Sequence, residues 1–254
     1  MASDEPPVGL AVRDGVATVR LSDPRHRNAL SKRMSDGLAA AVGAALDAGA
    51  RAIVLAAEPP VFCAGGSLDA LLDRGVPLAA MYAGLARLAD APVPTIAAVG
   101  GPAIGAAVNL PLACDVVVVS ERARFDPRFL DAGIHPGGGH LWRLAGRIGA
   151  QGAAALVLCG DVLDGREAVE RGLAWRCVAE DALEETALGL ARRAAERPSA
   201  LVRRTKETLR ASVALTDPGE AAALELRAQQ WSVERPEFAE SVRRIRSELA
   251  ARTR

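Results

Sequence analysis

Two short stretches of small residues decide the fold prediction: Phe62-Cys63-Ala64-Gly65-Gly66-Ser67-Leu68 and Gly100-Gly101-Pro102-Ala103-Ile104-Gly105-Ala106-Ala107. Each stretch follows a β-branched apolar run, so each is expected at the end of a strand. Residues with little or no side chain let backbone N–H groups approach a ligand without obstruction. We therefore expect one N–H group from each stretch to bind the same carbonyl oxygen and to stabilise the negative charge that develops on it.

The segments around these stretches alternate between strand and helix patterns. Residues 8–12 and 16–21 predict a hairpin around the turn dipeptide Asp14-Gly15. This alternation continues through residue 119 and predicts an α/β fold with parallel strand pairing. The further expected strands are 51–56, 95–99 and 116–119, and the expected helices are about 31–47, 68–89 and 104–113.

The second half of the chain is predicted to be mostly helical. A short helix is expected over Phe125 to Asp131, and another helix from Leu141. A helix from Asp164 to about Gly172 and a short strand over 175–178 follow. Beyond residue 181 the pattern is helical throughout, with three prolines placed at helix starts: Pro198, Pro218 and Pro236.

These patterns divide the chain into a core of residues 1–195 and a helical region of residues 196–254. The helical region has apolar positions at helical spacing, but too few to form a core of its own. We therefore expect it to pack on the main domain or on another subunit.

Composition excludes several classes of function. Lysine plus arginine and aspartate plus glutamate each number 31, so no net charge draws the chain to nucleic acid or to an anionic membrane. The four cysteines show no C-x-x-C spacing, which makes a disulfide framework or a zinc site improbable. The uncharged residues 91–114 are interrupted by four prolines, so they are interpreted as buried core rather than as a membrane span.

The acidic N-terminus lacks a signal pattern, and a cytoplasmic protein is expected.

Several motifs together resemble a known family, the crotonase superfamily, that is, the enoyl-CoA hydratase/isomerase proteins. The resemblance covers about residues 8–254 and implies an α/β spiral of β-β-α turns, followed by helices that trimerise. It also implies a homotrimer or a dimer of trimers, and an acyl-CoA thioester as ligand with no separate cofactor. The motifs in chain order are Arg25-His26-Arg27-Asn28-Ala29-Leu30, the first small-residue stretch, Pro94 to Asp115, Phe125 to Gly139, and Gly160-Asp161-Val162 to Gly172-Leu173.

By motif position, the resemblance assigns an oxyanion hole to the backbone N–H groups of Gly66 and Ala106. The family usually has glycine at the second position, but alanine also supplies an N–H group. Gly65 and Gly105 precede the two donors and belong to the same ligand-binding loops. The resemblance further places the Ala64 carbonyl near the CoA adenine.

The same resemblance places Arg25 and Arg27 near the CoA phosphates. Solvated surface charges are an equally good interpretation of both side chains.

Both glutamates that hydratases of this family use for acid and base work are replaced. Their positions carry Asn109 and Phe129, and neither side chain transfers a proton. Asn109 can still hydrogen-bond a water or a substrate carbonyl, and Phe129 would line the acyl pocket. Hydration by the usual two-carboxylate route is therefore not expected.

Substitute acids and bases must come from nearby. His135 and His140 flank the glycines of the 137–139 loop, and either imidazole is a suitable base or an ordinary loop and helix-start residue. Asp131 lies two residues past Phe129, an offset that turns it away from the site if the segment is helical. No third ligand accompanies the histidines, so no metal site is expected.

Two functions remain open at this point. One is an enzyme that stabilises an enolate of an acyl-CoA thioester, and the other is a protein that binds acyl-CoA without hydratase turnover.

Overall fold

The computed structural model describes residues 6–67, 69, 72 and 75–252. The chain groups into two compact units, Met1–Ala195 and Glu196–Arg254.

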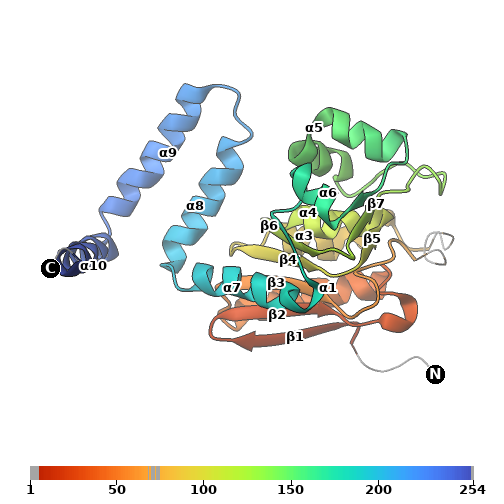
Figure 1. The fold of residues 1–254 in the computed structure, drawn as a ribbon, viewed down its shortest axis with the longest axis horizontal. Helices are drawn as coiled ribbons and strands as arrows, with labels where there is room; N and C mark the ends of the chain where they lie inside the picture. Colours follow the sequence, from red (N-terminus) through yellow and green to blue (C-terminus); the bar gives the residue numbers. More distant parts are fainter. Residues whose placement is uncertain (1–5, 68, 70–71, 73–74, 253–254) are drawn as a thin grey trace. The chain divides into compact units, whose positions relative to one another are not determined.

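The first unit is built on a six-stranded sheet with the order β1-β2-β3-β4-β6-β9 (Figure 1). Strands β1 and β2 form an antiparallel hairpin, and every other pair in this sheet is parallel. The hairpin turns at Asp14 and Gly15, which both have positive φ, at 51° and 74°. The predicted hairpin and parallel sheet are therefore confirmed. The strands are β1 Val8–Arg13, β2 Val16–Leu21, β3 Ala52–Ala57, β4 Thr95–Val99, β6 Val116–Ser120 and β9 Arg176–Val178.

Side chains alternate between the two faces of this sheet, as strand geometry requires. Each face of the sheet is covered by its own cluster of buried apolar side chains. In β3, Ile53 and Leu55 belong to the cluster on the first side, and Val54 belongs to the cluster on the second side. Helices α1 (Lys32–Asp47) and α3 (Ala83–Ala89) pack together on the first side. Helix α7 (Leu183–Ala195) packs against the second side, where its buried residues meet β3, β4 and β6.

A second, three-stranded sheet has the order β5-β7-β8 and lies beside the first small-residue stretch. Cys63 forms an isolated bridge to Ala103 of β5, so the stretch is attached to the edge of this sheet. A 3-10 turn, η3, follows β5 and leads into the short helix α4. The elements are β5 Pro102–Ile104, η3 Gly105–Val108, α4 Asn109–Ala113, β7 Arg124–Asp126 and β8 Leu163–Asp164.

Among the described residues, the remaining elements of the first unit are helices α5 and α6 and three 3-10 turns. Helix α5 (His140–Leu158) bends at Gly149, whose φ of 74° and ψ of 167° are not helical. Helix α6 (Gly165–Glu170) begins with a capping box between Asp164 and Glu167. The 3-10 turns are η1 Pro24–His26, η2 Leu78–Tyr82 and η4 Glu180–Ala182.

Three predicted helices differ in the structure. The helix expected over 125–131 is wrong, because Phe125 pairs with Ala103 and Leu163 in the second sheet and turns follow it. The helix expected over 104–113 is divided, since residue 104 ends β5 and a 3-10 turn precedes α4. The helix expected over 68–89 is not continuous, since residues 75–77 are not helical and the 3-10 turn η2 precedes α3; part of the segment lies outside the described residues.

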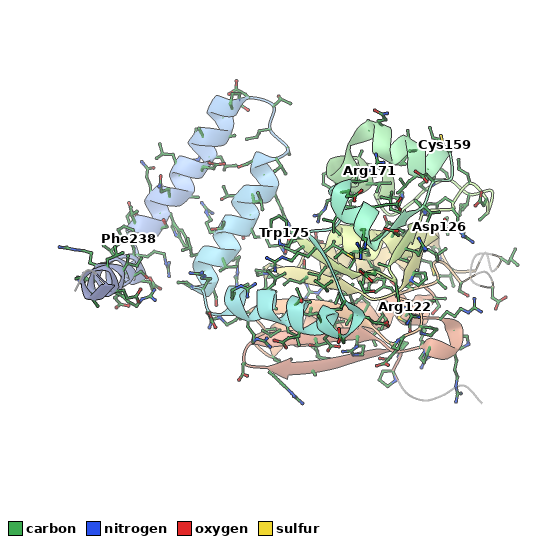
Figure 2. The ribbon with its side chains drawn as sticks, in the orientation of Figure 1. Arg122, Asp126, Cys159, Arg171, Trp175 and Phe238 are labelled. Atoms are coloured by element: carbon green, nitrogen blue, oxygen red, sulfur yellow. The ribbon has the colours of Figure 1, made fainter. Side chains whose placement is uncertain are left out.

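The second unit consists of three helices: α8 Ser199–Ser212, α9 Pro218–Val233 and α10 Pro236–Arg252. Pro218 and Pro236 are the first residues of their helices, and Pro198 directly precedes α8, as predicted. Several large apolar side chains of these helices are exposed, among them Phe238, which Figure 2 labels. In the described part of the chain, no helix is long and apolar enough to cross a membrane.

Candidate active site

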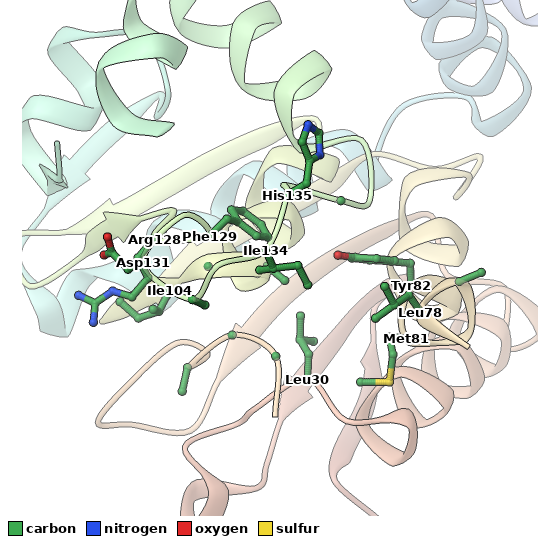
Figure 3. Close-up of a pocket in the computed structure, with 18 residues that line it drawn as sticks. Leu30, Leu78, Met81, Tyr82, Ile104, Arg128, Phe129, Asp131, Ile134 and His135 are labelled. Atoms are coloured by element: carbon green, nitrogen blue, oxygen red, sulfur yellow. The ribbon is translucent and has the colours of Figure 1, made fainter. Parts of the chain in front are cut away.

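A pocket of about 570 Å³ opens where the two small-residue stretches meet (Figure 3). Residues of both stretches form part of its wall, including Gly66 and Ala106. Most of the side chains in the wall are apolar. The six largest of these are Leu30, Leu78, Met81, Ile104, Phe129 and Ile134. The pocket therefore suits a ligand with an apolar chain.

Backbone hydrogen bonds fix the two stretches to each other. The Cys63 amide donates to the Pro102 carbonyl over 3.1 Å, and the Ile104 amide donates to the Cys63 carbonyl over 3.0 Å. Gly65 has a φ of +91°, and a Cβ atom there would lie 2.6 Å from the Ile104 carbonyl oxygen. Only glycine fits this position without strain.

Asn28 anchors the loop in front of the pocket. Its side chain is fully buried, and its Oδ1 accepts from the Asp23 amide over 2.8 Å. Its Nδ2 group donates to the Glu58 carbonyl over 2.9 Å and to the Val61 carbonyl over 3.1 Å. Arg27 beside it accepts a hydrogen bond from the Ala64 amide over 3.0 Å, so the anchored loop holds the first stretch in place.

The amides of Gly66 and Ala106 are available to a ligand. Neither N–H group donates a hydrogen bond to another residue in the described part of the chain. Ala106 is the second residue of η3, and its N–H group precedes the first hydrogen bond that such a turn makes internally. Two unused donors on one pocket wall can stabilise an oxygen that gains negative charge.

Cys63 lies within the first stretch, but its thiol is not a nucleophile. Burial raises its pKa to about 12, although the amides of Gly65 and Leu30 donate hydrogen bonds that lower it. The side chain is fully buried and stays a neutral thiol at physiological pH.

Asn109, which occupies the first glutamate position, forms hydrogen bonds to neighbouring residues through both polar atoms of its side-chain amide. Its Nδ2 donates to the Gly137 carbonyl over 3.1 Å, and its Oδ1 lies 3.1 Å from Nδ1 of His140. An amide oxygen only accepts, so the proton of the imidazole resides on Nδ1. Both side chains are buried and neither lines the pocket.

His140 is held in its neutral form behind the pocket wall. Burial, with a smaller contribution from the charge of Arg143, lowers its pKa to about 4. Its Nε2 is buried and has no hydrogen-bond partner among the described residues. The ring packs against Phe129, with centroids 4.9 Å apart and planes tilted by 59°. Phe129 lines the pocket and His140 does not, so at this position the pocket meets an aromatic ring rather than an acid or a base.

Asp131 and His135 line the pocket and are exposed, and each side chain has an atom that can accept a proton. Nδ1 of His135 lies 2.8 Å from the Pro136 carbonyl, so it carries the proton of the neutral ring and Nε2 keeps a lone pair. Asp131 was expected to turn away along a helix, but the segment is not helical and the residue reaches the rim. Asp126 is buried and accepts a hydrogen bond from Arg128.

Of the remaining residues predicted to bind the ligand, some line the pocket and others do not. Ala64, Gly65 and Gly105 line the pocket, whereas Arg25 and Arg27 are exposed and lie outside its wall. Sequence reasoning missed Tyr82, whose ring extends into the pocket in Figure 3.

Comparison with known proteins places this geometry in a family. The family model described as Enoyl-CoA hydratase/isomerase matches residues 11–245 of the chain. The chain belongs to the enoyl-CoA hydratase/isomerase family. Its crotonase fold, predicted from the motif order, is confirmed by solved structures of the family.

Three relatives illustrate the range of this family. A Mycobacterium tuberculosis protein named probable enoyl-CoA hydratase EchA14 is 41% identical over 244 residues, covering 92% of this chain and 94% of its own. The 1,2-epoxyphenylacetyl-CoA isomerase of Escherichia coli is 34% identical over 201 residues, covering 74% and 76% of the two chains. A Thermobifida fusca protein assigned as an enoyl-CoA hydratase, solved in complex with CoA, is 29% identical with a TM-score of 0.82, covering 92% and 95%.

Proposed function

We propose that this enoyl-CoA hydratase/isomerase family member binds an acyl-CoA thioester and stabilises its enolate. The amides of Gly66 and Ala106 take the thioester carbonyl oxygen, and the apolar pocket takes the acyl chain. The observation that carries the proposal is that Gly66 and Ala106 both line the pocket, and that neither amide has an internal acceptor in the described part of the chain. The CoA complex of the Thermobifida fusca relative supports the choice of ligand class.

Asp131 and His135 are the candidates for the base that removes a proton from the α-carbon. Each lines the pocket, and each has an atom that accepts a proton. In Figure 3 the His135 ring points away from Leu30 and Met81, and Asp131 lies near Arg128, so both stand at the rim rather than among the apolar side chains. The α-proton moves to this base, and the electron pair of the broken C–H bond moves toward the carbonyl oxygen.

Two-carboxylate hydration is not part of this proposal. The side-chain amide of Asn109 is hydrogen-bonded to Gly137 and His140, and the side chain of Phe129 is an aromatic ring without an acid or a base. The same observation favours a second candidate function, an acyl-CoA-binding protein without hydratase turnover.

A pair of ligands tests the oxyanion hole without any substitution. Butyryl-CoA carries the thioester carbonyl, and S-butyl-CoA, a thioether, has the same chain without it. Calorimetric titration should show butyryl-CoA binding at least about tenfold more tightly, because two donors would otherwise lose their acceptor. Equal affinities would refute a carbonyl-binding role for the two amides.

A second measurement separates the two candidate functions. An enolate-forming site exchanges the α-protons of butyryl-CoA in deuterated water, which proton NMR follows directly. Loss of exchange by about 100-fold in Asp131→Asn or His135→Gln, with His26→Gln as the exposed control, would identify the base. Binding without exchange or crotonyl-CoA hydration would favour the binding protein.

The proposal includes self-association through the second unit as a homotrimer or a dimer of trimers. The support is a set of exposed apolar side chains on α8, α9 and α10, namely Leu209, Leu226, Phe238 and Ile245. Light scattering on the eluting protein should give the mass of three or six chains. A monomer would contradict this part of the proposal alone.

A further inference from the structure

Tyr82 is fixed at the start of α3, beside the acyl pocket. Ser35 of α1 binds the backbone on both sides of it, since its Oγ donates to the Ala80 carbonyl over 3.3 Å and accepts from the Gly84 amide over 2.9 Å. Gly84 lies so close to α1 that a Cβ atom there would be 2.5 Å from the Ser35 carbonyl oxygen. The backbone that carries Tyr82 therefore has little freedom to move relative to α1.

The ring of Tyr82 is held against the glycines of the 137–139 loop. A Cβ atom at Gly138 would lie 2.6 Å from Cε1 of the ring, and one at Gly137 would lie 2.8 Å from the hydroxyl oxygen. The Gly137 carbonyl is bound by Asn109, so the loop that seats the ring is itself anchored. This packing fixes the direction of the ring before any ligand binds.

The hydroxyl of Tyr82 points into the pocket in Figure 3 and makes no hydrogen bond to another described residue. The residue is half-buried, and burial raises the pKa of its phenol. The hydroxyl is therefore a neutral donor at physiological pH, with only solvent as its partner in the absence of a ligand.

The other polar side chains of the pocket wall stand in different surroundings. Asp131 and His135 are exposed at the rim, and Arg128 is paired with Asp126. An acyl chain that fills the apolar part of the pocket displaces water from Tyr82, whereas the rim side chains keep their hydration. A saturated chain would leave the Tyr82 hydroxyl unpaired, which costs binding energy, while a chain with an oxygen atom would pair it.

We propose that Tyr82 recognises an oxygen substituent on the acyl chain, so that the ligand class is a hydroxyacyl- or oxoacyl-CoA thioester rather than a saturated one. This inference rests on the proposed function, because it assumes that the pocket holds the acyl chain of a CoA thioester. Tyr82 acts here as a specificity-determining residue.

The test compares four-carbon thioesters that differ only in oxygen: butyryl-CoA, both enantiomers of 3-hydroxybutyryl-CoA, 4-hydroxybutyryl-CoA and acetoacetyl-CoA. For the unaltered protein, at least one oxygenated thioester should bind roughly five- to tenfold more tightly than butyryl-CoA. Tyr82→Phe should reduce this advantage below about twofold without weakening butyryl-CoA, because it removes only the hydroxyl. Met81→Leu, a change in the same wall without a polar atom, should keep the advantage.

The outcomes distinguish this inference from the proposed function. If butyryl-CoA binds but no oxygenated thioester binds more tightly, the role of Tyr82 is refuted and the proposed function stands. The same holds if Tyr82→Phe still binds the oxygenated thioester more tightly than butyryl-CoA. If no thioester binds at all, the proposed function fails as well.

A second measurement does not depend on the variant folding. Tyr82 is the single tyrosine of the chain, so labelling with 3-fluorotyrosine gives one ¹⁹F resonance. The preferred oxygenated thioester should shift that resonance differently from butyryl-CoA, and identical shifts would overturn the assignment.

Discussion

Gly65 lies directly against the carbonyl of Ile104, so close that a Cβ atom on Gly65 would stand 2.6 Å from that oxygen. The contact joins two segments that are far apart in the sequence and that each carry one of the proposed oxyanion donors. The position of Gly66 relative to Ala106 therefore depends on the absence of a side chain at residue 65.

Gly65→Ala should weaken butyryl-CoA binding at least about tenfold and lower the free energy of unfolding by about 2–3 kcal/mol. The added methyl group meets Ile104, and alanine also disfavours the φ of +91°. Urea unfolding and calorimetry measure the two effects.

Gly49→Ala is the matched control for this substitution. Gly49 has a similar φ of +78°, but nothing lies within 4 Å of a Cβ atom there. It should lose only about 1 kcal/mol and keep its affinity for the thioester. Equal losses in the two variants would show that backbone strain, and not the contact with Ile104, dominates.

Asn109→Asp should destabilise the protein by about 1–3 kcal/mol, although the two side chains have nearly the same shape. The carboxylate cannot donate to the Gly137 carbonyl, which Asn109 does over 3.1 Å, so two acceptors would face each other in a buried place. Urea unfolding tests this, with the exposed Gln151→Glu in α5 as the control for an amide-to-acid change. Unchanged stability would show that the bond to Gly137 does not hold the loop.

The sequence predicts those parts of the fold and site that depend on residues close together in the chain, and it fails where contacts between distant segments decide the structure. The strand at Thr95–Val99 follows from an uninterrupted apolar run, and the structure has it as predicted. The stretch around Gly105 lines the pocket, but it contains strand β5 and a 3-10 turn where a loop and a helix start were expected. The helix expected over 125–131 failed because pairing of Phe125 with distant strands overrides its local pattern.

Tyr82 was missed for a related reason. It lies inside a segment with a helical pattern, where an aromatic residue indicates core packing as readily as a binding site. Its importance comes from contact with Gly137 and Gly138, which are far along the chain. The one signal available was that it is the single tyrosine in a chain with few aromatic residues.

The phenol of Tyr82 should titrate above its ordinary pKa of 10.0, because burial favours the neutral form. The sign follows from linkage: this contribution to stability is fully present below the unfolded pKa and is lost as the pH rises through the folded one. Tyrosinate absorbance measures the titration, and Tyr82→Phe provides the blank because no other tyrosine is present. A midpoint at or below the ordinary value would mean that the hydroxyl is fully hydrated in the fold.

His140 should make the protein less stable as the pH falls from about 6.5 to about 4, because burial lowers the pKa of its imidazole from 6.5 to about 4. Across this range the unfolded chain takes up a proton that the folded chain excludes, so the stability present above pH 6.5 is lost progressively. The full difference is on the order of 3 kcal/mol.

His140→Asn should flatten this part of the pH dependence, since the amide nitrogen of asparagine takes the place of Nδ1 and can still donate to Asn109 Oδ1, but the side chain does not titrate. His26→Gln is the control for the loss of a histidine, because the His26 side chain is 74% exposed. Urea unfolding at several pH values measures the slope for the three proteins. Equal slopes in all three would mean that His140 is protonated as readily in the folded protein as in the unfolded chain, and the buried neutral imidazole behind Phe129 would have to be abandoned.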